Sequence, residues 1–305
     1  MLQDLAFAAL RISTPLIFAA MGGLLTYQAG ILNIALDGFM IVGAFSAVWA
    51  AYVFASLTAG LLAGVVSAVA LAGLLALFAL EFHADIFIAG VAITFLAYGL
   101  TSLLLAGVFG QDGMFQSARI PVFPTVHLPL IERIPLLGPV LSGHTPLVYL
   151  AYALVPAVAW LLYRTRWGLR VRMTGEAEDA AAAAGVPTGR LKLQTLLLSG
   201  LCCGLAGSYL SLDYVSLFSR QMTNERGLIA LAAIFFAKGR PFGTLAVAVL
   251  FGLATALSVR LPELTGMAPQ LLELLPYAVT VLALVAVGWR TTRLARRTGG
   301  RRFGI

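Results

Sequence analysis

Long apolar segments alternate with short polar ones along most of the chain, a pattern typical of a polytopic helical membrane protein. No charged residue occurs between Gly38 and Leu80, a run of 43 residues that is about twice the length of one span. Two spans must therefore share it, with a turn near Ser56, Thr58 and Gly60. The spans expected from the pattern are 5–25, 33–55, 56–80, 86–109, 145–163, 193–212, a short 227–237, 241–259 and 271–289.

These segments predict an all-α membrane protein with about nine transmembrane segments, within a range of about 8–10, some of them broken. We expect a single transmembrane domain over residues 1–305. Its longest interruption, 111–143, is polar and rich in proline, and is expected to be an extramembrane loop on the extracytoplasmic side.

One polar passage, 173–192, has the signature of a short helix rather than a loop. Thr174 and Gly175 are suitable N-cap residues, Glu176 places negative charge in the first turn, and Gly185 supplies the stop signal. A helix over 176–184 would be about 14 Å long, too short to cross a bilayer. Its alanines, Ala180 and Ala182 among them, form a small face that another protein can approach closely. The alternative is an ordinary solvated helix between two spans.

Composition supports the membrane class, since 60% of the residues are hydrophobic and 11% are charged. The net charge of +7 is explained by topology. Fourteen lysines and arginines fall on one side of the expected spans, in the loop 164–192, the turn 238–240 and the tail 290–305, and five fall on the other. Because such residues are retained in the cytoplasm, we expect this loop and this tail to be cytoplasmic and the N-terminus to lie outside.

Asn33 and Asp37 are polar residues at the start of an expected span. Their spacing of four would place them on one helical face. A carboxylate in a span usually faces a bundle interior or a wet cavity, so we expect both residues, with Phe39 nearby, to border a translocation pathway. The alternative is that Asp37 is a solvated or capping carboxylate near the cytoplasmic end.

A second irregular passage, 213–227, precedes the run 227–237, which is too short to cross a bilayer alone. Its backbone must be sheltered by protein or water, which indicates a discontinuous helix. We expect Asn224 and Glu225 to lie within reach of solute or of an external gate. The alternative is an external loop followed by a shallow re-entrant hairpin. The two irregular passages echo each other weakly, as in an inverted repeat or by chance similarity.

Enzymatic motifs for phosphate loops, zinc proteases and serine hydrolases do not occur in the sequence. The adjacent Cys202 and Cys203 lie in an apolar run and indicate packing rather than a disulfide or a metal site. We expect no catalytic, cofactor or metal site in this chain.

Three stretches carry a resemblance to a known family. They are GGLLTYQAGILNIALDGFMIVGAF, then TRWGLRVRMTGEAEDAAAAAGVPTGRLK with LSGLCCGLAGSYLSL, and FSRQMTNERGLIALAAIFFAKGRPFGTL. They resemble the membrane permeases of ABC importers in the branched-chain amino acid and ribose superfamily, most closely its nucleoside or simple-sugar branch. Tyr27 and Asp37 stand where that branch commonly has Glu, and Ala35 where it commonly has Gly.

The resemblance implies a multi-pass protein of a bacterial-type cytoplasmic membrane that pairs with a second permease, identical or related. It also implies a cytoplasmic ATP-binding subunit, which would hydrolyse ATP and receive the polar helix as a coupling helix, and an extracytoplasmic substrate-binding lipoprotein. A branched-chain amino acid permease is the nearest alternative. An ion-driven secondary transporter is a more distant one, because such a carrier needs no cytoplasmic coupling helix.

Overall fold

The computed structural model describes residues 2–110, 113–126 and 138–265, and this part of the chain is almost entirely helical. The elements in chain order are α1 (Leu2–Gln28), α2 (Leu36–Phe54), α3 (Leu57–Ala76), the π-helical turn η1 (Leu77–Glu81), α4 (Ile86–Phe109), β1 (Met114–Phe115), α6 (Gly138–Leu141), α7 (Pro146–Arg164), α8 (Arg166–Glu176), α9 (Glu178–Ala183), α10 (Thr188–Ser208), the π-helical turn η2 (Tyr209–Tyr214), β2 (Phe218–Ser219), α11 (Arg226–Phe236) and α12 (Pro241–Thr265).

Seven helices of the described ranges are long and apolar enough to cross a membrane: 3–28, 36–54, 57–81, 86–109, 146–164, 188–214 and 241–260. They match seven of the nine expected segments. The eighth, α11, has 11 residues, as short as the sequence predicted. The expected span 271–289 and the tail 290–305 lie outside the described residues, so nine crossings stay a prediction.

The charge-free run divides into two helices, as predicted. Ala55 adopts a left-handed conformation at the end of α2, and the side chain of Ser56 caps α3 by accepting a hydrogen bond from the backbone N–H of Ala59. The turn is shorter than expected, because Thr58 and Gly60 already belong to α3.

The centre of the bundle is formed by α1, α2 and α10. The apolar windows of these helices are 67%, 72% and 78% buried, whereas those of α3 and α4 are each only 28% buried. The central helices therefore form the core, and α3 and α4 leave much of their surface uncovered. Bulky apolar side chains on α4, such as Phe95 and Leu103, are about 70% exposed, as suits a surface that lipid or another membrane protein covers.

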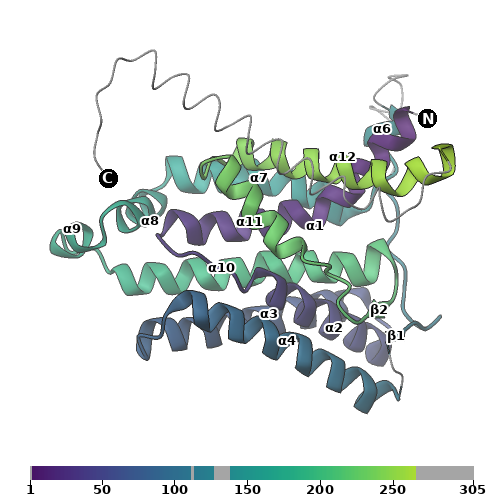
Figure 1. Cartoon of the computed structure of the whole chain (residues 1–305), viewed down its shortest axis with the longest axis horizontal. Helices are drawn as coiled ribbons and strands as arrows, with labels where there is room; N and C mark the ends of the chain where they lie inside the picture. Colours follow the sequence, from purple (N-terminus) through teal and green to yellow (C-terminus); the bar gives the residue numbers. More distant parts are fainter. Residues whose placement is uncertain (1, 111–112, 127–137, 266–305) are drawn as a thin grey trace.

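The two ends of the bundle differ in what they carry (Figure 1). Helices α8 and α9 project at one end, and the N-terminus lies at the opposite end with the short antiparallel pair β1–β2. The polar connection between α7 and α10 is thus remote from the strands.

That connection differs from the single helix expected at 176–184. The predicted start of that helix was wrong. Helix α8 already begins at Arg166, where the side chain of Thr165 accepts a hydrogen bond from the backbone N–H of Gly168 at 3.0 Å. Thr174 and Gly175 therefore lie inside α8 and cap nothing. Ala177, with φ −154° and ψ 88°, breaks the helix, and α9 follows as a separate turn of six residues. The expected stop is confirmed, because Gly185 has a φ of +79°.

Candidate functional site

Two breaks in the helices meet at the carboxylate of Asp37. Its Oδ1 accepts a hydrogen bond of 2.9 Å from the backbone N–H of Gly227, in the first turn of α11. Its Oδ2 accepts one of 2.9 Å from the hydroxyl of Thr223, and a further one from the hydroxyl of Tyr98 on α4. The side chain, itself in the first turn of α2, is 3% exposed. One carboxylate thereby links α2, α4 and the start of α11.

The surroundings of Asp37 explain why a charge can be buried there. A helix N-terminus presents unpaired N–H groups and a partial positive charge, and Asp37 lies between two such ends, those of α2 and α11. Its three donors replace water around the carboxylate. The approach of the two helices requires glycine at 227, because a Cβ there would lie 2.4 Å from the backbone nitrogen of Asp37.

Asn33 does not share a helical face with Asp37, and that expectation was wrong. Its Oδ1 accepts a hydrogen bond of 3.0 Å from the backbone N–H of Ala35, so the chain turns before the helix begins at Leu36. Its Nδ2 donates to the hydroxyl of Ser199 on α10 at 3.1 Å. Asn33, which is 1% exposed, therefore anchors the segment 29–35 to the bundle core.

A cavity of about 410 Å³ opens beside Asp37, with walls formed by α4, the segment before α2 and the segment before α11. Three polar residues on its rim, Gln221, Asn224 and Glu225, have positive φ angles of 54°, 45° and 57°. The loop thus turns three exposed polar side chains towards one space. The residues that line the cavity are Ile34, Asp37, Val91, Thr94, Phe95, Tyr98, Gln221, Asn224, Glu225 and Leu228.

The structure brings together three of the five residues expected on a pathway: Asp37, Asn224 and Glu225. Phe39 is fully buried in the apolar core, and neither it nor Asn33 lines the cavity. Sequence reasoning missed Phe95 and Tyr98, which bring aromatic rings to the wall. Their spacing of three on α4 carried a signal, since such residues share a helical face.

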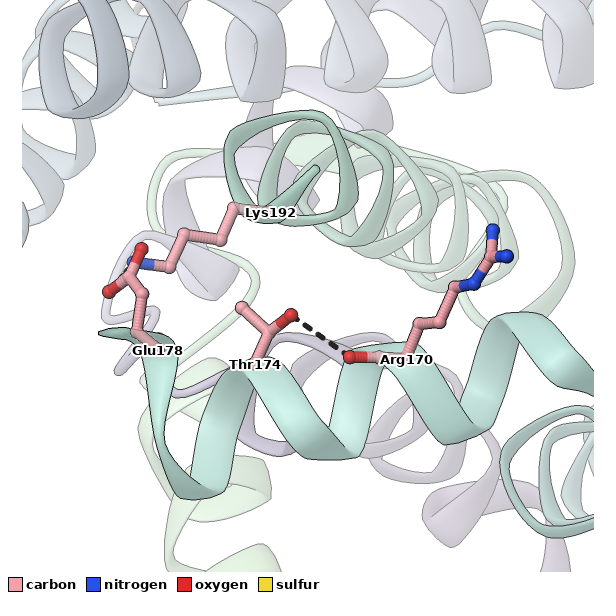
Figure 2. A network of polar contacts seen from close by, with 4 residues as sticks. All are labelled: Arg170, Thr174, Glu178 and Lys192. Atoms are coloured by element: carbon pink, nitrogen blue, oxygen red, sulfur yellow. Dashed lines mark hydrogen bonds and ion pairs between the residues drawn. The ribbon is translucent and has the colours of Figure 1, made fainter. Parts of the chain in front are cut away.

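The connection between α7 and α10, residues 165–187, contains α8 and α9, and we call it the α8–α9 loop. It is held to α10 by a contact shown in Figure 2. The Nζ of Lys192 lies 2.6 Å from Oε2 of Glu178, which ties the start of α9 to α10. Within α8, the hydroxyl of Thr174 donates to the carbonyl oxygen of Arg170 at 2.9 Å. Ala181 packs inward at 1% exposure, while Ala180 and Ala182 are exposed. The small outward face expected from the alanines is therefore present.

Among the described residues, no three His, Cys, Asp or Glu side chains lie together as a group that could hold a metal ion. Cys202 and Cys203 are buried free thiols.

Comparison with known proteins places the chain among permeases. Residues 5–284 match the family described as branched-chain amino acid transport system / permease component. The chain is 32% identical over 313 residues to the putative glucose ABC transporter permease protein TsgC13 of Haloferax volcanii, covering 94% of this chain and 93% of that protein.

Two further relatives carry nucleoside names. The nucleoside ABC transporter permease protein NupC of Lactococcus lactis is 31% identical over 296 residues, covering 93% of this chain and 92% of that protein. The guanosine ABC transporter permease protein NupQ of Bacillus subtilis is 32% identical over 295 residues, covering 91% and 89%. No solved structure matches the chain.

Proposed function

The chain belongs to the permease component family of branched-chain amino acid transport systems, and we propose that it is the membrane-spanning subunit of an ATP-driven importer for nucleosides or simple sugar-like solutes. Names of relatives that match over about nine-tenths of the chain, one a nucleoside, one a guanosine and one a putative glucose permease, support this solute class. Permease subunits of this kind are not enzymes themselves, and we assign ATP hydrolysis to a separate subunit.

The observation that carries the solute class is the charge of the cavity. Its described lining contains two carboxylates and two side-chain amides, and it includes no lysine, arginine or histidine. The Asp37 carboxylate is already bound by three donors, so Asn224, Gln221 and Glu225, with the hydroxyl of Thr94, are the polar groups left to meet a solute. Amides and a carboxylate suit hydroxyl and ring N–H groups, and Phe95 and Tyr98 offer rings for stacking.

The alternatives fit this cavity less well. A branched-chain amino acid brings an ammonium group, which Glu225 could pair with, and also a carboxylate, for which the described lining offers no cation. An ion-driven carrier needs carboxylate oxygens that are free to bind an ion. Those of Asp37 are occupied by Gly227, Thr223 and Tyr98, which leaves Glu225 without a second free carboxylate in the described lining to pair with.

A second permease, identical or related, would cover the open side of the cavity. Asn224 and Glu225 are exposed there beside α4, whose Phe95 is 71% exposed. Polar groups of this kind cannot face lipid, so this side of the molecule needs protein or water against it.

The orientation we propose follows the basic residues. Arg164 ends α7, and Arg166, Arg170 and Arg172 lie on α8, so this end of the bundle is assigned to the cytoplasm, together with the tail 290–305. The exposed alanines of α9 would then dock on the ATP-binding subunit, and the opposite end, with β1–β2, would face the substrate-binding lipoprotein. The membrane is the bacterial-type cytoplasmic membrane.

The test is ATP hydrolysis by the complete complex of permeases, ATP-binding subunit and lipoprotein in liposomes. We expect guanosine, uridine or glucose to stimulate hydrolysis, and leucine and uridine monophosphate to have no effect. Stimulation by leucine alone would refute the proposed solute class. Solute uptake that depends on a sodium or proton gradient, and that proceeds without the ATP-binding subunit, would refute the importer itself.

A further inference from the structure

The end of α8 is in backbone contact with the end of α1. A Cβ placed on Gly175 would lie 2.2 Å from the carbonyl oxygen of Gln28 and 2.9 Å from the nitrogen of Gly30. A Cβ on Gly30, which has a φ of +78°, would lie 3.2 Å from the Cα of Gly175. The two segments touch through their main chains, with no flexible side chain between them. Such a contact cannot yield to movement as a long side chain would.

The turn between α11 and α12 joins the same contact. The side-chain Nε2 of Gln28 donates to the carbonyl oxygen of Gly239 at 2.7 Å. The ring of Tyr27 packs edge-on against Phe235 near the end of α11, with centroids 5.6 Å apart. Residues 27–30, Gly175 and the segment 235–239 thus form one contact point, which we call the glycine junction.

Two segments of the chain connect the glycine junction to Asp37. One is the segment 29–35, which ends at the start of α2, and it is fixed on the way by Asn33. The other is α11, whose 11 residues span about 16 Å. The last turn of α11 lies at the junction, and its first turn contains Gly227, the residue that donates to Asp37. A helix of this length moves as a rigid rod. Because Asn33 holds the segment 29–35 to α10, a displacement of α8 would reach the hydrogen bonds of Asp37 chiefly through α11.

We propose that the glycine junction transmits the movement of the α8–α9 loop to the Asp37 site, and so couples the ATP-binding subunit to the solute cavity. This inference rests on the proposed function, because it presumes that the α8–α9 loop is displaced by a partner. Gly175 is then a positioning residue that acts inside the permease, rather than part of the surface that touches the ATP-binding subunit.

The variant Gly175→Ala tests this contact cleanly. Alanine is a better helix former than glycine, so the change should not weaken the last turn of α8, while the added Cβ blocks the approach to Gln28 and Gly30. The matched control is Gly189→Ala near the start of α10, at which a Cβ would meet nothing within 4 Å. Both variants are made in the full chain and purified as the complete complex.

The first measurement is solute transported per ATP hydrolysed. We expect this ratio to fall roughly fivefold or more in Gly175→Ala, the lower end of the usual coupling between two sites. It should be unchanged in Gly189→Ala. A wild-type complex that transports none of the tested solutes would refute the proposed function. A working wild type with an unaltered ratio in Gly175→Ala would refute the junction alone.

The second measurement separates transmission from distortion. The variant Asn224→Cys, on the cavity rim, is labelled with a water-soluble thiol reagent with and without ATP, and the labelling of the buried native thiols, measured in the wild type, is subtracted. We expect Asn224→Cys to change its labelling rate with ATP, and the double variant Asn224→Cys with Gly175→Ala to keep the ATP-free rate but lose the change. An equal shift in both states would mean simple distortion and would overturn the proposal, as would a normal response to ATP.

Discussion

Replacing Asp37 with alanine should destabilise the permease severely, because its carboxylate joins two helix starts and α4. The change leaves the buried N–H of Gly227 without an acceptor, whereas the hydroxyls of Thr223 and Tyr98, 3.3 Å apart, can still pair with each other. A buried donor left unpaired costs about 1–3 kcal/mol, and the lost hydrogen bond from Thr223 to a charged group costs about 1.5–3 kcal/mol, so together they give about 2.5–6 kcal/mol. The lost contact of the Tyr98 hydroxyl with the carboxylate adds to this sum.

Asp37→Asn separates charge from hydrogen bonding at the same position. The amide oxygen can still accept from Gly227, and its nitrogen can donate to the hydroxyls of Thr223 and Tyr98. What is lost is the charge-assisted part of the hydrogen bonds and the interaction with the two helix ends, about 1–3 kcal/mol in total. Asn should therefore rank between wild type and Ala.

The control is Asp85→Ala at the start of α4. Asp85 also accepts from helix N–H groups, those of Phe87 and Ile88 at 2.9 and 3.0 Å, but it is exposed, and loss of such a cap costs only about 1 kcal/mol. The assay is the apparent melting temperature of the detergent-solubilised complex, measured by size-exclusion chromatography of samples after heating. Equal loss in Asp37→Ala and Asp85→Ala would refute the structural role assigned to Asp37.

Two further outcomes follow from the ends of the bundle. Ala182→Trp on the exposed face of α9 should lower transport per ATP while leaving insertion and assembly intact, because a bulky ring blocks close docking; transport at the wild-type rate in an assembled complex would show that α9 is an ordinary loop helix. Burial, and to a lesser extent the charge of Arg11, lowers the pKa of His144. Below about pH 6.5 the unfolded chain therefore binds a proton at this residue that the folded chain does not, and the melting temperature should decrease as the pH is lowered further. This fall should be smaller in His144→Gln, and an identical pH profile would contradict it.

The sequence was a good guide to the spans because apolar length and charge placement act locally. Asp85, Gly110 and Gly185 end or start their helices where the pattern predicted. The sequence-based prediction failed at 166–176, where an amphipathic helix continues through residues that resembled helix caps. The buried Val171 and Thr174 hold that helix against the bundle, and such packing is invisible in local propensity.

The candidate site could be predicted only in part. Asp37, Asn224 and Glu225 stood out because polar residues are rare in such segments. The partners of Asp37, however, lie 61 to 190 residues away along the chain. The contact of one carboxylate with two helix starts forms only when the chain is folded, so it cannot be predicted from a single sequence.

The meeting of two helix starts at Asp37 also sets how the site responds to membrane voltage. Each helix N-terminus carries roughly half a positive charge, so two of them with one carboxylate sum to about zero. A net charge moved across the membrane would feel about 2.3 kcal/mol per 100 mV, and the local charges at the Asp37 carboxylate nearly cancel. Under the proposed function, rearrangement around this carboxylate with an uncharged solute moves little charge, in keeping with an importer driven by ATP hydrolysis rather than by the membrane potential.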